Sequence, residues 1–132
     1  MGVDVLLIWE GMTFEDWIKV RAVSHLHEAY HGEPYATSVL IDEGVDENVT
    51  VEKKRMFVGT HIESEYELIP VRARKLRDIL PKVLKVAMER QAKLYHENAT
   101  IDSPEIRAFS DFVELAEKKE KEGKKLYISV SY

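Results

Sequence analysis

The sequence predicts a single α+β domain, residues 1–132, in which a mixed or antiparallel sheet of four or five strands is covered by about three helices. The chain of 132 residues has a common size for one domain with one core. Its longest amphipathic segment, residues 71–97, repeats apolar residues at three- and four-residue steps, as a helix with one buried side does. Both ends of the chain have the pattern of strands, so this helix has a sheet to cover.

The first element predicted is a strand over residues 3–10. This apolar and β-branched run ends at Gly11 and is typical of a central strand, because both of its faces are mostly apolar. Thr13, with Asp16 three residues later, then indicates the start of a helix over residues 14–30. The apolar residues of this helix are too widely spread for one stripe, so the helix is either buried on several sides or broken near Ser24.

Gly32 and Pro34 end that helix, because glycine suits the position after a helix and proline disfavours helical geometry in the residue before it. Residues 35–41 are predicted to form the second strand. An acidic loop without periodicity is predicted to follow over residues 42–48.

The middle of the chain is predicted to return to strands and then to form the long helix. Residues 55–61 are predicted as a strand, and residues 62–68 alternate apolar or small side chains with glutamates, which favours a half-exposed strand. Pro81 lies inside the amphipathic segment, where proline removes a hydrogen bond and clashes with the preceding turn. We therefore expect a break or kink, with helices over residues 72–80 and 81–96.

The C-terminal part gives the clearest signals. Residues 102–105, Asp-Ser-Pro-Glu, combine a capping side chain, a proline in the first turn and an acid, and they predict a helix over residues 103–122. Its apolar stripe is expected to comprise Ile106, Phe109, Phe112, Val113 and Ala116. The final strand, residues 125–132, is expected to place Leu126, Ile128, Val130 and Tyr132 on one face.

The composition restricts the classes of function. The chain has no cysteine, which excludes disulfides, iron–sulfur clusters and thiolate catalysis within it. No apolar run approaches the ~18 residues of a membrane span, and no signal sequence is evident, so we expect an intracellular, cytoplasmic protein without a membrane partner. Charged residues make up 33% of the chain and amides are few, which is typical of proteins adapted to heat.

One short string has the form of a catalytic metal site. Residues 27–31 are His-Glu-Ala-Tyr-His, and on a helix His27 and His31 would project from the same side and share one Zn²⁺. The string resembles the signature of the zincin metallopeptidases. The resemblance implies that His27 and His31 bind zinc and that Glu28 acts as general base on a metal-bound water.

The zinc hypothesis requires a third ligand from elsewhere, and the spacing does not choose among the candidates, which are His61, Glu63, Glu65, Glu67 and His96. His25 is left out, because on a helix it points to a different side from His27. The competing interpretation is a helix end whose histidines only make hydrogen bonds. A zinc-dependent hydrolase is thus the alternative function.

The charges are unevenly distributed along the chain, whose net charge is −5. Residues 1–50 carry ten acids and two bases, whereas residues 72–93 carry eight bases and two acids. The pattern does not favour nucleic-acid binding by the basic segment, because Asp78 and Glu89 are spaced to pair with Lys82 and Lys93 and no aromatic residues are interleaved.

The leading functional prediction is a small protein-interaction or regulatory module without catalysis. The acidic first third complements the basic middle, and a terminal strand can present an edge to a neighbour. The expected partner is a second copy of the chain or another protein.

Overall fold

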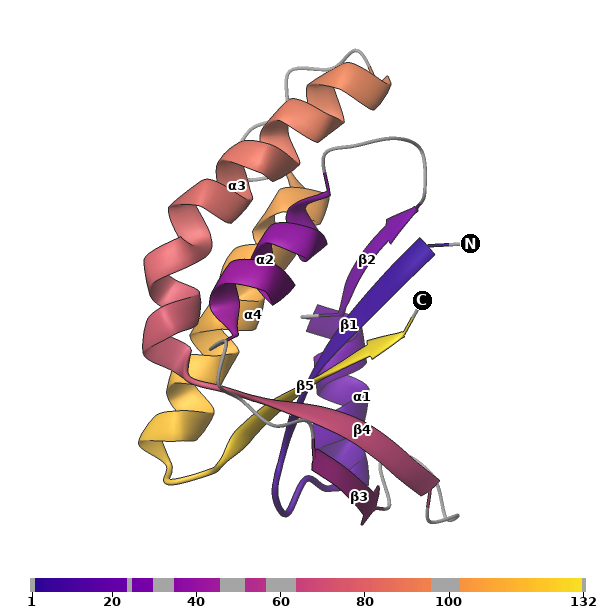
Figure 1. Cartoon of the computed structure of the whole chain (residues 1–132), viewed down its shortest axis with the longest axis vertical. Helices are drawn as coiled ribbons and strands as arrows, with labels where there is room; N and C mark the ends of the chain where they lie inside the picture. The colour runs from indigo at the N-terminus through magenta and orange to yellow at the C-terminus, as the bar shows by residue number, and fades with distance from the viewer. Residues whose placement is uncertain are drawn as a thin grey trace.

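The computed structural model describes residues 2–23, 25–29, 35–45, 52–56, 64–95 and 103–131. Within these ranges the chain forms five strands and four helices (Figure 1). In chain order they are β1 (Gly2–Trp9), α1 (Phe14–Val23), β2 (Leu26–Ala29), α2 (Ala36–Gly44), β3 (Glu52–Met56), β4 (Ser64–Val71), α3 (Ala73–Tyr95), α4 (Pro104–Lys121) and β5 (Leu126–Ser131).

The strands form one sheet in the order β2-β1-β5-β4-β3, and every neighbouring pair is antiparallel. The first and last strands lie next to each other, with Leu7 opposite Ile128 and Trp9 opposite Leu126. The α+β class is confirmed, in its antiparallel form. The interior position of β1 also agrees with the central strand that its apolar run predicts.

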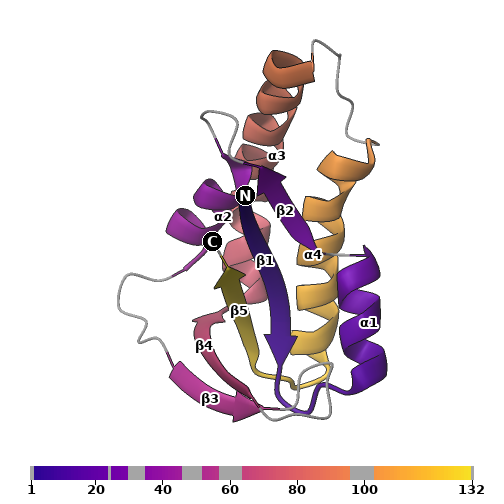
Figure 2. The same cartoon turned by 90° about the vertical axis from the view of Figure 1, so that its right-hand side faces the viewer.

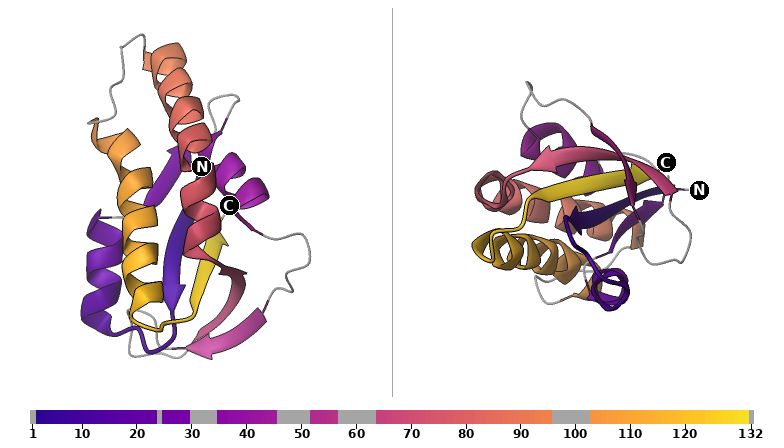
Figure 3. Two further views of the ribbon diagram at one scale, coloured as in Figure 1. Left: turned by 90° about the vertical axis from the view of Figure 1, so that its left-hand side faces the viewer. Right: turned by 90° about the horizontal axis from the view of Figure 1, so that it is seen from below.

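The helices lie against one face of the sheet. Figure 2 shows α3 and α4 behind the strands, and the views in Figure 3 show the same arrangement from the helical side and from below. α3 packs against both α2 and α4, and α1 makes smaller contacts with α4 and β1. The result is a two-layer molecule in which α1 lies at one margin beside β2.

The core lies between the two layers and follows from the periodicity of each element. Alternate residues of β1 are buried against the helices, namely Val3, Val5, Leu7 and Trp9. The predicted stripe of α4 is confirmed, since all five of its apolar residues are buried. In α3 the buried stripe includes Leu76, Leu80, Val83 and Ala87.

The predicted helix over residues 14–30 is wrong in its second half, because α1 ends at Val23 and β2 follows it. In β2, Leu26 lies opposite Val5 and Glu28 opposite Val3, so the strand extends the sheet beyond β1. The break near Ser24, which the scattered apolar pattern left open, therefore exists. The start of α1 is as predicted: the Asp16 amide donates to Thr13 Oγ1 at 3.1 Å and the Thr13 amide donates to Asp16 Oδ2 at 3.0 Å.

The predicted strand over residues 35–41 is also wrong, because residues 36–44 form α2, including part of the expected acidic loop. β-branched residues suggested a strand, but Ala36, Leu40 and Gly44 are buried at four-residue steps, as one side of a helix requires. A Cβ atom on Gly44 would lie 3.0 Å from Leu76 Cδ2, so glycine permits the close approach of α2 to α3. Tertiary packing thus overrides local strand propensity here.

The middle segment differs from the prediction at its proline. α3 runs without a break from Ala73 to Tyr95 with Pro81 inside it, so the expected division into two helices is wrong. β4 confirms residues 64–68 of the alternating segment as a strand, and residues 62 and 63 lie outside the described residues. For the strand expected over 55–61, β3 covers residues 52–56 and the remainder lies outside the described residues.

Candidate functional site

The string predicted to bind zinc is not helical where the structure describes it. His27 and Glu28 belong to β2, and successive side chains of a strand point to opposite faces. His27 is half exposed, whereas Glu28 is buried. His31 lies outside the described residues. The helical geometry assumed for residues 26–29 is therefore wrong, and zinc binding by His27 and His31 stays a prediction.

The Glu28 carboxylate holds the N-terminus of α2. Its Oε2 accepts the Ala36 amide at 3.0 Å, and its Oε1 accepts the Thr37 amide at 2.5 Å. Arg90 Nε of α3 lies 3.3 Å from Oε2, and the side chains of Glu28 and Arg90 are 8% and 9% exposed. The Arg90 guanidinium also lies 4.6 Å from the ring centre of Tyr35.

These contacts engage both oxygens of Glu28 and connect β2, α2 and α3. A carboxylate at the N-terminus of a helix is stabilised by the free amides and by the helix dipole. The geometry therefore supports a structural role for Glu28 and gives no support to its predicted role as general base.

A second polar group lies at the edge of the sheet, where β2 pairs with β1. Asp4 of β1 lies opposite His27 in the register of β1 and β2. Asp4 Oδ1 lies 2.8 Å from His25 Nε2 and 3.0 Å from His27 Nδ1. The side chains are 24% (His25), 52% (His27) and 37% (Asp4) exposed, so the group is accessible.

The chemistry of this Asp4–His25–His27 group follows from its hydrogen bonds. An ionised carboxylate only accepts, so each neutral imidazole carries its proton on the nitrogen that faces Asp4. The sequence analysis left out His25 because it assumed a helix; in an extended chain, residues 25 and 27 share a face. The signal that would have found this group is the alternation over residues 25–28, in which the buried Leu26 and Glu28 alternate with the more exposed His25 and His27.

Two of the candidate third ligands of the zinc hypothesis belong to a described strand that is not next to β2. Glu65 and Glu67 belong to β4, and two strands, β1 and β5, lie between β4 and β2. His61, Glu63 and His96 lie outside the described residues. Where the chain is described, no group of three or more His, Asp or Glu side chains is arranged so that it could hold a metal ion.

Four of the eight basic residues over residues 72–93 form ion pairs with acids on neighbouring elements, namely Arg72, Arg77, Lys82 and Arg90. Arg72 Nε lies 3.2 Å from Glu120 Oε2, and Arg77 is bonded to Glu117, which joins α3 to α4. Lys82 Nζ lies 2.6 Å from Glu43 Oε2 of α2, so its partner is not Asp78 as the helical spacing suggested. This pairing does not test whether the segment binds nucleic acid, so the absence of such binding stays a prediction.

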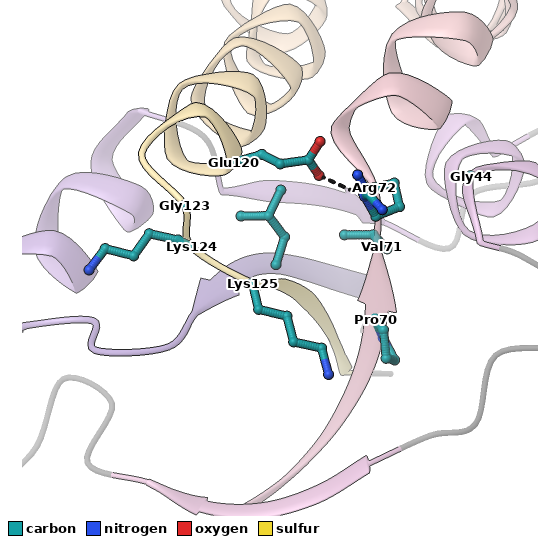
Figure 4. Close-up of a pocket in the computed structure, with 9 residues that line it drawn as sticks. Gly44, Pro70, Val71, Arg72, Glu120, Gly123, Lys124 and Lys125 are labelled. Carbon is teal, nitrogen blue, oxygen red and sulfur yellow. Dashed lines mark hydrogen bonds and ion pairs between the residues drawn. The ribbon is translucent and has the colours of Figure 1, made fainter.

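A cavity of about 560 Å³ lies where β4 meets α3 and α4 meets β5 (Figure 4). Glu120 Oε2 accepts hydrogen bonds there from the Ala73 amide at 3.1 Å and from Arg72 Nε at 3.2 Å. The Lys124 side chain extends away from Arg72 and Glu120 in Figure 4. The cations of this cavity do not converge on one point, and the start of α3 is already held by a carboxylate.

The outward side of α1 carries exposed apolar residues. Phe14 is 58% and Ile18 is 47% exposed. The rings of Phe14 and Trp17 are stacked with centres 6.4 Å apart, and the Arg21 guanidinium lies 5.0 Å from the ring centre of Trp17. These four residues, at steps of three and four, form one stripe that we call the α1 face.

Comparison with family models, with curated proteins and with solved structures finds no match to this chain. No helix of the described residues combines the length and apolar character needed to cross a membrane. Inference about function therefore depends on the features of the molecule itself, above all the α1 face.

Proposed function

We propose that this chain is a protein-interaction module that associates with a second copy of itself through the α1 face. The observation that carries the proposal is the exposure of Phe14 and Ile18, which are the large hydrophobic residues exposed among those described. Elsewhere in the described ranges such side chains are packed away, whereas these two stand one helical turn apart.

The composition of the α1 face suits a protein partner. Aromatic residues and arginine are enriched among the residues that contribute most to binding at protein interfaces. Phe14, Trp17 and Arg21 already contact one another in sequence, so little side-chain freedom remains to be lost on binding.

The charge pattern of α1 favours a second copy in antiparallel orientation. The first turn carries Glu15 and Asp16, and the last turn carries Arg21. Antiparallel pairing about the middle of the α1 face places Phe14 of one copy opposite Arg21 of the other, and Trp17 opposite Ile18. It also brings the acidic first turn to the basic last turn and opposes the two helix dipoles. Parallel pairing would place like charges together.

Sedimentation velocity over a wide concentration range tests the proposal. A single ten-residue helix gives a small interface, so we expect weak association. The average mass of the unmodified chain should rise toward that of a dimer as its concentration approaches about 100 μM. Ile18→Asp should remain monomeric. Ala92→Asp, which adds the same charge at an exposed position of α3, should associate like the unmodified chain.

A charge exchange tests the orientation. Arg21→Glu should weaken association, and the double variant Glu15→Arg with Arg21→Glu should restore it, because the antiparallel pair regains its complementary ends. An unmodified chain that stays monomeric at about 1 mM would refute self-association and leave the α1 face for a different protein. If Ile18→Asp associates as strongly as the unmodified chain, the α1 face is not the interface between the two copies.

A further inference from the structure

We propose that a hollow at the C-terminal end of α1 receives the Phe14 side chain of a second copy of the chain. This hollow, of about 320 Å³, lies where the end of α1 meets β2 and the start of α4. The proposal rests on the association through the α1 face and adds the site at which the partner's ring binds. The observation that carries it is that Phe14, the most exposed large apolar side chain among the described residues, lies at one end of α1 and an apolar hollow at the other.

The walls of the hollow suit an aromatic ring. Ala22 of α1, Leu26 of β2, and Ala108 and Phe109 of α4 line it with apolar atoms. Figure 2 shows that β2 and α4 continue beyond the end of α1, so both elements are present where the hollow lies. Leu26 and Phe109 are otherwise buried in the core, which holds these walls in place. A ring that enters the hollow therefore buries apolar surface and meets a second aromatic ring, and both effects favour binding.

Only the ring of a partner can reach this hollow. Phe14 and Ala22 of one copy are separated by about 12 Å along the helix axis, so the ring does not fill the hollow of its own chain. Antiparallel pairing instead places the partner's Phe14 opposite Arg21, one residue before Ala22. Side chains of a helix lean toward its N-terminus, and in an antiparallel partner this direction points to the C-terminal end of the first helix. The partner's Phe14 therefore leans toward the hollow.

Two-fold symmetry makes this contact reciprocal, because each copy gives one ring and receives one. Contact between two ten-residue helices alone buries less than the roughly 1,200–2,000 Å² of a standard interface. The two hollows extend the interface from α1 onto β2 and α4 of each copy. A ring that is 58% exposed in one copy thus becomes a buried anchor in the other, as aromatic residues commonly are at the centres of binding energy in interfaces.

A substitution that fills the hollow and leaves α1 unchanged tests the proposal. Ala108 is half-buried on α4 and lines the hollow, so Ala108→Gln places a longer, uncharged side chain where the partner's ring should bind. In sedimentation velocity of the full chain we expect Ala108→Gln to weaken association at least about tenfold. Ala92→Gln makes the same change at an exposed position of α3 and should associate like the unmodified chain.

Because Ala108→Gln also alters α4, a second measurement uses the unmodified chain. In an equal mixture of ¹³C-labelled and unlabelled chain, isotope-filtered NMR should show a nuclear Overhauser effect between the Phe14 ring of one copy and the Ala108 methyl group of the other. A chain that associates without this effect, or an Ala108→Gln variant that associates as strongly as Ala92→Gln, would overturn the hollow as the binding site and leave the α1 face as the interface. A chain that stays monomeric at about 1 mM would overturn both proposals.

Discussion

At the scale of single residues, the Glu28 network gives a direct prediction about stability. Glu28→Gln removes the charge that pairs with Arg90 and that interacts with the start of α2, while it keeps the size of the side chain. We expect the free energy of unfolding to fall by roughly 1–3 kcal/mol, as for other buried polar groups that lose a partner. Urea denaturation at neutral pH measures it. Glu89→Gln, at an exposed position of α3, should change little, and an equal loss in both variants would contradict a special role for Glu28.

The sequence predicted local contacts between residues better than distant ones. The reciprocal hydrogen bonds of Thr13 and Asp16 were expected from their spacing, and the Thr13 amide lowers the pKa of Asp16 by stabilising its charged form. The partners of Glu28 are 8 to 62 residues away in the chain, and nothing in its neighbourhood identifies them. The Asp4–His25–His27 group could not be predicted for the same reason, because Asp4 and His27 are distant in the chain and meet only through the pairing of β1 with β2.

At the scale of elements, the pairing of α3 with α4 should depend on pH. The hydrogen bond from Arg77 holds the pKa of Glu117 below its ordinary value of 4.5, against the opposing effect of burial. A carboxyl group whose pKa is lower in the folded state stabilises the fold above its unfolded pKa, and this contribution is lost as the pH falls through the folded pKa. Glu117→Gln should therefore cost stability at pH 7, by less than about 1 kcal/mol because both side chains are more than one-third exposed.

Urea denaturation of Glu117→Gln and the unmodified chain across pH measures this effect. The difference in stability between them should shrink below about pH 4, where Glu117 becomes protonated in the unmodified chain as well. Glu89→Gln supplies the control, since that glutamate lies on the exposed side of α3. A difference that stays constant down to pH 3 would show that the ion pair is not its origin.

Elements with one strong periodicity were predicted correctly, and elements whose class depends on their neighbours were not. α4 has its proline and its stripe in the expected places, and β5 is a strand as expected, although its burial does not alternate because Leu126, Tyr127 and Ile128 are all buried. α2 carries residues typical of strands, but it is held as a helix by the Glu28 carboxylate at its start and by packing on α3. Pro81 does not end α3, because the packing of this helix against α2 and α4 outweighs the local cost of proline.

At the scale of the whole molecule, the sequence indicated that both ends of the chain enter the sheet, and the structure places them side by side in its interior. The order of the strands was beyond prediction. The order of the strands depends on which edges of the sheet the helices leave free. Those edges could not be predicted, because β2 was predicted as part of a helix and α2 as a strand. A strand of four residues gives too short a pattern to be separated from the preceding helix by periodicity alone.

This order predicts how stability is distributed. β1 and β5 each have a strand on both sides, so their amides should exchange with deuterium only through global unfolding and more slowly than those of other elements. β2 is an edge strand of four residues and α1 makes few contacts, so both should exchange faster through local opening. Native-state hydrogen exchange with mass spectrometry resolves the two classes. Protection of β2 equal to that of β5 would contradict this ranking. The faster class includes the helix that carries the α1 face, so a partner bound there should raise the protection of α1 and leave that of β5 unchanged.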